Sequence, residues 1–142
     1  MNQQADVASL SFECLAALSN VAGRLEEALG PLGLSLAKFG ALSKLVAARE
    51  ALPLSTLAER CACVRSNITQ LVDRLEAENL VARVHDPRDR RSVLAELTEE
   101  GRRRQEAGRR AIERAEAEIF GRVPAAQQEA LRGFFRALRA QP

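Results

Sequence analysis

The chain has 142 residues, of which 46% are hydrophobic and 28% charged, a size and composition that fit one globular domain and exclude a disordered chain. No apolar run approaches ~18 residues, and Met1–Ala8 lacks the features of a signal peptide, so we expect no membrane-spanning helix and a cytoplasmic location. The net charge of +2 indicates no partner by itself, although only Lys38 and Lys44 among the 21 basic residues are not arginine.

Two helices are predicted first. The segment from Val7 to Leu29 repeats apolar residues at nearly heptad spacing, which is typical of a helix–helix seam, and Gly30-Pro31 ends it. Ser35 is a suitable cap for a second helix over 36–48. The residues that we expect to face inward from this helix are Phe39, Leu42, Leu45 and Val46.

A short helix from about Leu54 to Cys61, a tight turn and a longer helix from about Arg65 to Asn79 follow. Asn79 is a suitable stop residue. The apolar face of the longer helix is predicted from Ile68, Leu71, Val72 and Leu75. Near its start, polar side chains lie largely on the other face, and they are Arg65, Ser66, Asn67, Thr69 and Gln70.

The next segment reads as a β-hairpin. Short, partly alternating apolar patterns over 81–84 and 92–97 predict two strands, and Pro87 makes the segment between them a turn. Four arginines lie on or next to this turn, at Arg83, Arg88, Arg90 and Arg91.

Two further helices complete the chain. Thr98 is a good N-cap for a charged helix over about 99–120, with a thin apolar stripe of small residues, and Gly121 and Pro124 end it. The last helix carries apolar residues at helical spacing, namely Leu131, Phe134, Phe135 and Leu138.

A helix with polar residues at its start, followed by a hairpin with arginines at its tip, indicates a DNA-binding protein. The major groove admits a helix, and Arg65, Asn67 and Gln70 carry the donors and acceptors that read base edges there. Arginines of the hairpin could reach the neighbouring minor groove, where a narrow groove strengthens the negative potential.

The sequence resembles the MarR family of winged helix-turn-helix transcriptional regulators. The resemblance is carried by Leu57-Ala58-Glu59-Arg60, by Leu75-Glu76 and Leu80-Val81, by Asp-Pro-x-Asp-Arg-Arg at 86–91, and by Leu97-Thr98-x-x-Gly101. It implies a mainly α fold with a small β-wing, in which about 36–98 form the DNA-binding lobe and about 7–30 and 99–140 form dimerisation helices.

The resemblance also implies a function. We expect a homodimer that binds a palindromic operator in double-stranded DNA, and a repressor that a small aromatic or phenolic ligand or an oxidant releases. The alternative is a winged-helix module for protein–protein interaction without specific DNA binding. We find no nucleophile–base pair, metal constellation or phosphate loop, and therefore expect no enzyme activity, metal or cofactor.

The family pattern assigns roles to single residues. Arg91 or Arg90 is expected in the minor groove, held by Asp89, and Arg88 is expected on a phosphate. The alternative is a solvated turn in which the aspartates neutralise the arginines. Arg74, which we include in the recognition helix, and Arg83 could each touch phosphate or pair with a nearby acidic residue, among Asp73, Glu76 and Glu78.

The sequence departs from the family pattern before the recognition helix. Pro53 holds the place of the usual Thr or Ser cap, and Ala62-Cys63-Val64 replaces a Gly-Val-Ser-like turn, so that Ser66 could cap one residue later.

Three cysteines, Cys14, Cys61 and Cys63, allow two interpretations. Each lies where apolar packing explains it, and a buried cysteine behaves as a small hydrophobe. The functional interpretation is a redox switch, although the chain has no tyrosine to assist Cys14. The only histidine, His85, gives no zinc site with them.

Overall fold

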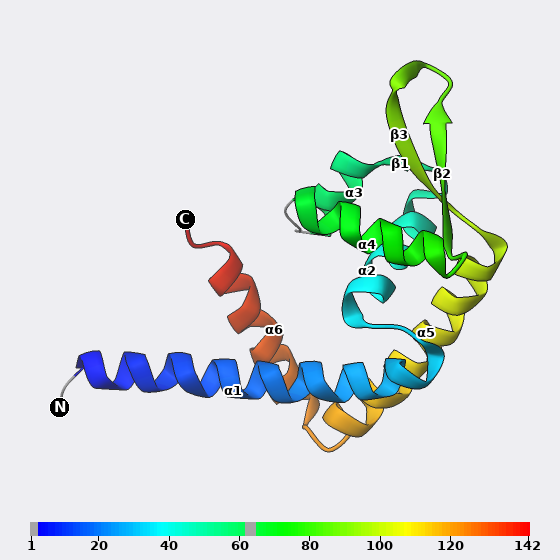
Figure 1. Ribbon diagram of the computed structural model, residues 1–142. Helices are drawn as coiled ribbons and strands as arrows, with labels where there is room; N and C mark the ends of the chain where they lie inside the picture. The colour runs from blue at the N-terminus through cyan, green and yellow to red at the C-terminus, as the bar shows by residue number, and fades with distance from the viewer. Residues whose placement is uncertain (1–2, 62–64) are drawn as a thin grey trace.

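The computed structural model describes the backbone of residues 3–61 and 65–142, and side chains over 9–61 and 67–142. It confirms the predicted fold class, because the described chain is mainly helical with one small antiparallel sheet, whose hairpin projects beyond the helices (Figure 1). The elements in chain order are α1 (Gln3–Leu29), a 3-10 turn (Gly30–Leu32), α2 (Leu36–Ala48), β1 (Leu52–Pro53), α3 (Leu54–Arg60), α4 (Arg65–Ala77), β2 (Val81–Asp86), β3 (Asp89–Leu97), α5 (Glu99–Phe120) and α6 (Ala125–Arg139).

The core lies in the lobe made by α2, α3, α4 and the sheet. The predicted inward residues Leu42, Leu45 and Leu75 are buried there, and Phe39 packs against them from a partly buried position. Burial of such side chains contributes about 2 kcal/mol each. The lobe is therefore held by the apolar stripes that the sequence predicts.

Local signals end the helices where the chain must turn. Asn79 has a left-handed backbone with φ of 59°, and the Leu80 N–H donates to the Leu75 carbonyl at 2.8 Å, which closes a Schellman motif. Gly33 does the same after the first helix, with φ of 68°. Ser35 caps α2 as predicted, since its hydroxyl accepts from the Lys38 N–H at 3.2 Å.

The sheet has the order β1-β3-β2, so β3 is central and β2 lies at an edge. The strand β1 was not predicted; its two residues pair with Ala95 and Leu94. The hairpin strands are also longer than predicted, because β2 continues to Asp86 and β3 begins at Asp89. The turn is therefore reduced to Pro87 and Arg88, and Arg90 and Arg91 lie in a strand.

Other boundaries moved by a few residues. The first helix begins at Gln3 instead of Val7, the third ends at Arg60 with Cys61 as its cap residue, and the fourth ends at Ala77 instead of Asn79. The predicted bounds 36–48 and 99–120 are those of α2 and α5.

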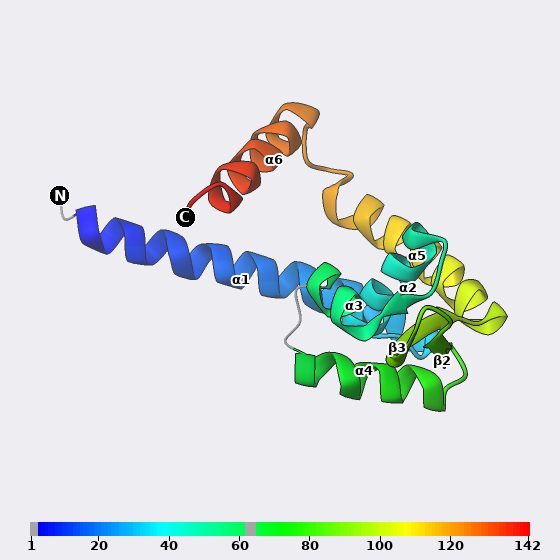
Figure 2. The ribbon, with the colours of Figure 1, turned by 90° about the horizontal axis from the view of Figure 1, so that it is seen from above.

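The helices α1, α5 and α6 form arms that extend away from the lobe (Figures 1 and 2). The first half of α1 exposes apolar side chains, with Phe12 at 73% and Leu15 at 59%. The exposed apolar residues of α6 are Leu131, Phe134 and Leu138. These arms leave apolar surface uncovered within a single chain.

The junction of lobe and arms is tight at the start of α5. Thr98 caps this helix as predicted, its hydroxyl accepting from the Gly101 N–H at 2.9 Å and donating to the Asn79 carbonyl at 2.7 Å. A Cβ atom on Gly101 would lie 2.0 Å from the Leu80 carbonyl oxygen. Only glycine allows this approach.

Gly101→Ala should therefore lower the free energy of unfolding by about 3 kcal/mol, because a main-chain oxygen must move. Urea unfolding measures the change. Gly40→Ala in α2 is the control: nothing lies within 4 Å of its added Cβ, so alanine should stabilise the helix by about 0.5–1 kcal/mol. Equal stability of Gly101→Ala and the native chain would contradict the packing described here.

Candidate nucleic-acid interface

The helix α4 presents three different stripes along its length. Its core stripe is fully buried at Ile68, Val72 and Leu75, with Leu71 at 8% exposure. A second stripe, at i, i+3 and i+7 spacing, is exposed and consists of Asn67, Gln70 and Arg74. A third stripe faces β2 and consists of Thr69, Asp73 and Glu76. Burial of the first stripe therefore turns the second outward.

The predicted recognition residues divide between these stripes. Asn67, Gln70 and Arg74 share the open face, whereas Thr69, although exposed, lies on the side nearer β2. The predicted side chains of Arg65 and Ser66, and the turn 62–64 with Cys63, lie outside the described residues.

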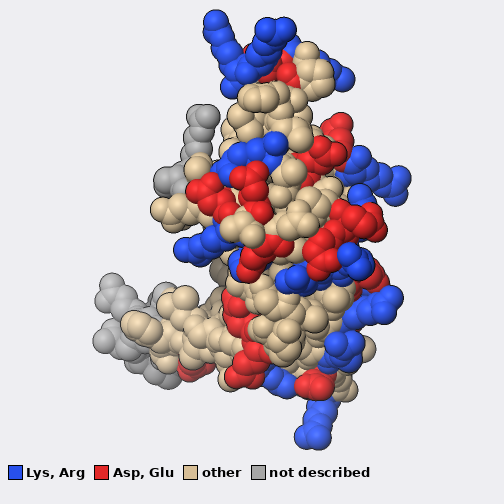
Figure 3. Space-filling view, turned by 45° about the vertical axis from the view of Figure 1, so that its right-hand side comes forward, with Lys and Arg blue, Asp and Glu red and all other residues tan. Residues whose placement is uncertain are grey.

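The hairpin formed by β2 and β3, here called the wing, projects from the lobe, and basic side chains gather at its tip (Figure 3). Arg88, Arg90 and Arg91 are all exposed. Asp86 accepts from the Arg88 N–H and Asp89 from the Arg91 N–H, both at 2.9 Å. These carboxylates fix the backbone of the turn and leave the guanidinium groups free to face outward.

The predicted role of Asp89 is only partly matched. Its carboxylate contacts the main chain of Arg91, and among residues 81–97, which the structure describes, no ion pair joins it to a wing arginine. The pairing is irregular here: Asp86 pairs with Asp89 and His85 with Val93, so Arg90 and Arg91 lie between the paired positions of β3. Asp89 and Arg91 line a shallow groove together with Pro53 and Ser55 at the start of α3.

Arg83 resolves one alternative that the sequence left open. Its Nη2 lies 2.6 Å from Asp73 Oδ1 and its Nη1 lies 3.0 Å from Glu76 Oε1. Burial lowers the pKa of Arg83, but hydrogen bonds to Asp73 and Glu76 more than offset this, so that pKa is raised. Arg83 is therefore a paired residue of the lobe.

Glu78 and Arg74, the other charged residues for which the sequence left the partner open, differ in whether they form an ion pair. Glu78 pairs with Lys38 of α2 at 2.9 Å, a contact across 40 residues that the sequence analysis missed. Arg74 is exposed, and no ion pair joins it to Asp73, Glu76 or Glu78, all of which the structure describes.

The many arginines of α5 form a contrast with those of the wing. Most pair with glutamates one turn away; Arg109, for example, contacts Glu106 and Glu113. The hydrogen bond from Arg109, supported by Arg110, lowers the pKa of Glu106 to about 2. Ion pairs thus neutralise much of this face of α5, whereas within the described residues no ion pair involves Arg88, Arg90 or Arg91.

The structure describes two of the three cysteines, Cys14 and Cys61. Cys14 is partly exposed on α1, and Cys61 is partly buried at the end of α3, packed against the core. Within the described part of the chain, no three His, Cys, Asp or Glu residues are grouped to hold a metal ion. A redox role for Cys14, Cys61 or Cys63 stays a prediction.

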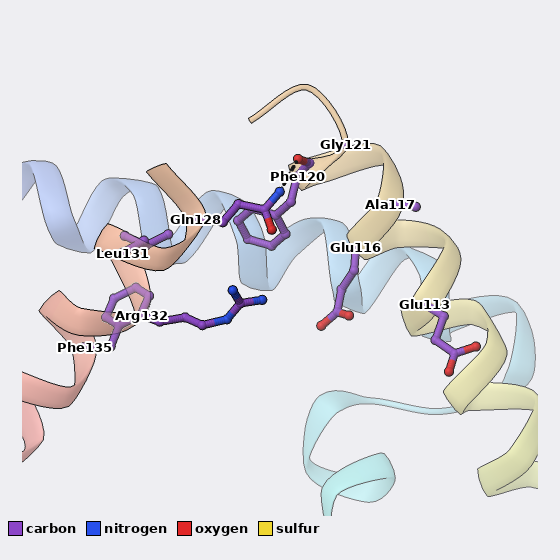
Figure 4. A pocket seen from close by; sticks show the side chains of 9 residues that line it. All are labelled: Glu113, Glu116, Ala117, Phe120, Gly121, Gln128, Leu131, Arg132 and Phe135. Atoms are coloured by element: carbon purple, nitrogen blue, oxygen red, sulfur yellow. Dashed lines mark hydrogen bonds between the residues drawn. The ribbon is translucent and has the colours of Figure 1, made fainter. Parts of the chain in front are cut away.

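A cavity of about 460 Å³ lies between α5 and α6 (Figure 4). Phe120, Leu131 and Phe135 give it an apolar wall, and Arg132 extends from α6 toward Glu116 of α5 (Figure 4). The Gln128 side chain stabilises the connection between α5 and α6 by donating to the Phe120 and Val123 carbonyls at 3.2 and 2.9 Å. The cavity is remote from the wing.

Within the described residues, no helix combines the length and apolarity needed to cross a membrane.

A helix pair whose second member exposes a polar face, followed by a β-hairpin, defines a winged helix-turn-helix protein. In comparison with known proteins, residues 34–93 match the model of the MarR family. The resemblance predicted from the sequence is thus confirmed over this part of the chain.

The chain is 45% identical over 64 residues to the HTH-type transcriptional repressor MdtR of Bacillus subtilis, covering 43% of this chain and 41% of MdtR. It is 36% identical over 91 residues to the transcriptional activatory protein BadR of Rhodopseudomonas palustris, covering 64% of this chain and 51% of BadR. The chain thus matches from two fifths to half of the length of these relatives.

Among solved structures, the chain resembles CouR of Rhodococcus jostii RHA1 bound to p-coumaroyl-CoA. The TM-score is 0.79 at 28% sequence identity, over 94% of this chain and 93% of CouR. This similarity in fold covers the helical arms as well as the segment that the family model matches.

Proposed function

We propose that the protein is a sequence-specific regulator of transcription that binds double-stranded DNA. The observation that carries the proposal is the joint exposure, in one lobe, of the polar stripe Asn67, Gln70 and Arg74 and of an arginine-tipped wing. A helix in the major groove with a cationic hairpin alongside it reads both grooves at once. The regulators MdtR and BadR support the proposal by their similarity.

We assign the contacts as follows. The amide and guanidinium groups of Asn67, Gln70 and Arg74 meet base edges or phosphates of the major groove, together with Arg65, Ser66 and Thr69. Arg91 enters the minor groove, because Asp89 fixes its backbone, and Arg88 at the turn meets a phosphate. Arg90, which precedes Arg91 in β3, is the alternative residue for the minor groove.

We propose further that the active form is a homodimer. The uncovered apolar side chains of α1 and α6 need a partner, and a second copy offers the same surface in a two-fold arrangement. Residues 36–98 then form the DNA-binding lobe, and 7–30 and 99–140 the dimerisation arms. Two recognition helices about 34 Å apart would match successive major grooves of a palindrome.

The proposed regulator is a repressor that an effector releases. CouR is bound to an aromatic acyl-CoA, which supports a small aromatic or phenolic compound as the effector class here. Release requires that the effector bind more tightly to the arrangement of lobes that does not fit DNA. An oxidant acting on a cysteine is the second effector class that the chain allows.

Arg91→Ala should weaken binding to a cognate duplex about tenfold and lower the salt slope of log K by about 1, because one cationic contact is lost. Fluorescence anisotropy at several salt concentrations measures both. Arg139→Ala at the end of α6 removes the same charge far from the wing and serves as the control. Sedimentation should show that both variants remain dimers. Unchanged affinity of Arg91→Ala would rule out the wing assignment.

Leu15→Glu should dissociate the dimer, since a charge replaces an apolar side chain at the proposed interface at a cost of about 2 kcal/mol or more. The residue is 59% exposed in the single chain, so its helix content should persist. Analytical ultracentrifugation gives the dissociation constant. Asn20→Glu, on another face of the same helix, should leave the dimer intact. A dimer unaffected by Leu15→Glu would place the interface elsewhere.

A further inference from the structure

Arg83 makes an unusually dense set of contacts between the wing and the recognition helix. Its guanidinium reaches Asp73 at 2.6 Å and Glu76 at 3.0 Å, and its Nη2 lies 3.5 Å from the Thr69 carbonyl oxygen. Its backbone N–H also donates to Glu76 Oε2 at 3.0 Å. One residue of β2 thus contacts two turns of α4.

The acceptors form a single stripe of the helix. Thr69, Asp73 and Glu76 follow i, i+4 and i+7 spacing, so they lie above one another on the face toward β2. The base-reading stripe of Asn67 and Gln70 lies on a different face. Since the guanidinium is a planar fork, contacts to two carboxylates oppose both rotation of α4 about its axis and sliding along β2.

Glu76 has a second part in the arrangement. The strand β2 lies at the edge of the sheet, where backbone groups lack a strand partner on one side. The Glu76 carboxylate accepts from both the backbone and the side chain of Arg83. The helix is therefore tied to the strand itself as well as to a flexible side chain.

We propose that Arg83, with Asp73 and Glu76, is a positioning device for DNA reading, which holds the wing and the recognition helix at one fixed spacing. This inference rests on the proposed DNA-binding function and deepens it. Contacts to the major groove from α4 and to the minor groove from the wing then form in the same register. Without these ion pairs, α4 could still contact the major groove and the wing could still contact the minor groove. Forming both contacts at the same time would then cost more free energy.

The net charge of this cluster argues against the alternative interpretation, in which Arg83 contacts a DNA phosphate. One guanidinium faces two carboxylates, so the cluster carries more negative than positive charge and would repel a phosphate. The two interpretations give opposite signs for one substitution. Removing a carboxylate would free Arg83 and strengthen a phosphate contact, whereas it would weaken a positioning device.

The test therefore neutralises the carboxylates. Asp73→Asn and Glu76→Gln should each lower affinity for a cognate duplex roughly tenfold, comparable to the loss of a base contact, although each removes a negative charge. Affinity for non-cognate duplex should stay unchanged or rise. Glu96→Gln is the matched control: this exposed residue of β3 pairs with Ala82, and its neutralisation should not weaken cognate binding.

Arg83→Lys adds a readout that distinguishes position from charge. Lysine keeps the charge but cannot hold two carboxylates in a planar fork, so cognate affinity should fall while the salt slope stays within the range of the native chain. Thermal unfolding of each variant, with binding measured well below the midpoint, separates this effect from unfolding.

Three outcomes would overturn the inference. Higher cognate affinity of Asp73→Asn and Glu76→Gln would identify Arg83 as a phosphate ligand. Native cognate affinity of all three variants would show that the contacts are without consequence for reading. Failure of the native protein to prefer any duplex would overturn the proposed function itself, and the native control reveals this before any variant is measured.

Discussion

The structure depends on the burial of one stripe of α4. Ile68, Val72 and Leu75 are fully buried, so the helix cannot rotate without exposing them to water. This burial fixes where every other side chain of the helix points. Polar groups reach solvent on one side, and carboxylates meet the wing on another. The residues that the core buries thus determine which polar side chains of α4 face solvent.

The same constraint links the helix to the wing and to the arms. The chain leaves α4 through the Schellman turn at Asn79 and enters β2, while Thr98 and Gly101 pack back against this turn. Arg104 of α5 donates to the Leu32 carbonyl at 2.8 Å, and Gln105 contacts Ser43 of α2 at 3.3 Å. A change in the angle of the arms would therefore be passed to the polar face of α4 that we propose reads DNA.

The sequence predicted what periodicity and capping control. The helices α2 and α5, their caps at Ser35 and Thr98, and the stop at Asn79 follow from local residue chemistry and are confirmed. The strand β1 escaped prediction because two residues carry no periodicity; its partner β3 alone defines it. The turn was predicted too long because the charged residues Arg90 and Arg91, three and four residues after Pro87, resemble loop residues, although they lie in β3.

The candidate site divides in the same way. The sequence predicted which residue types form the site and in what order, but it did not predict which residues pair with its charged side chains. Asp89 holds main chain, Arg83 holds two carboxylates, and Lys38 meets Glu78 across the fold. Such pairings depend on which strand approaches which helix face, and several acidic residues near Arg83 satisfied the same spacing rules. Only the packed arrangement selects among them.

The most direct test is to let the protein select duplexes from a random pool and to map the selected site by methylation interference. The account predicts an enriched palindrome with two patches of guanine N7 interference about 10 base pairs apart and adenine N3 interference where each wing lies. Selection of no common sequence, or interference confined to one groove, would contradict joint reading by α4 and the wing.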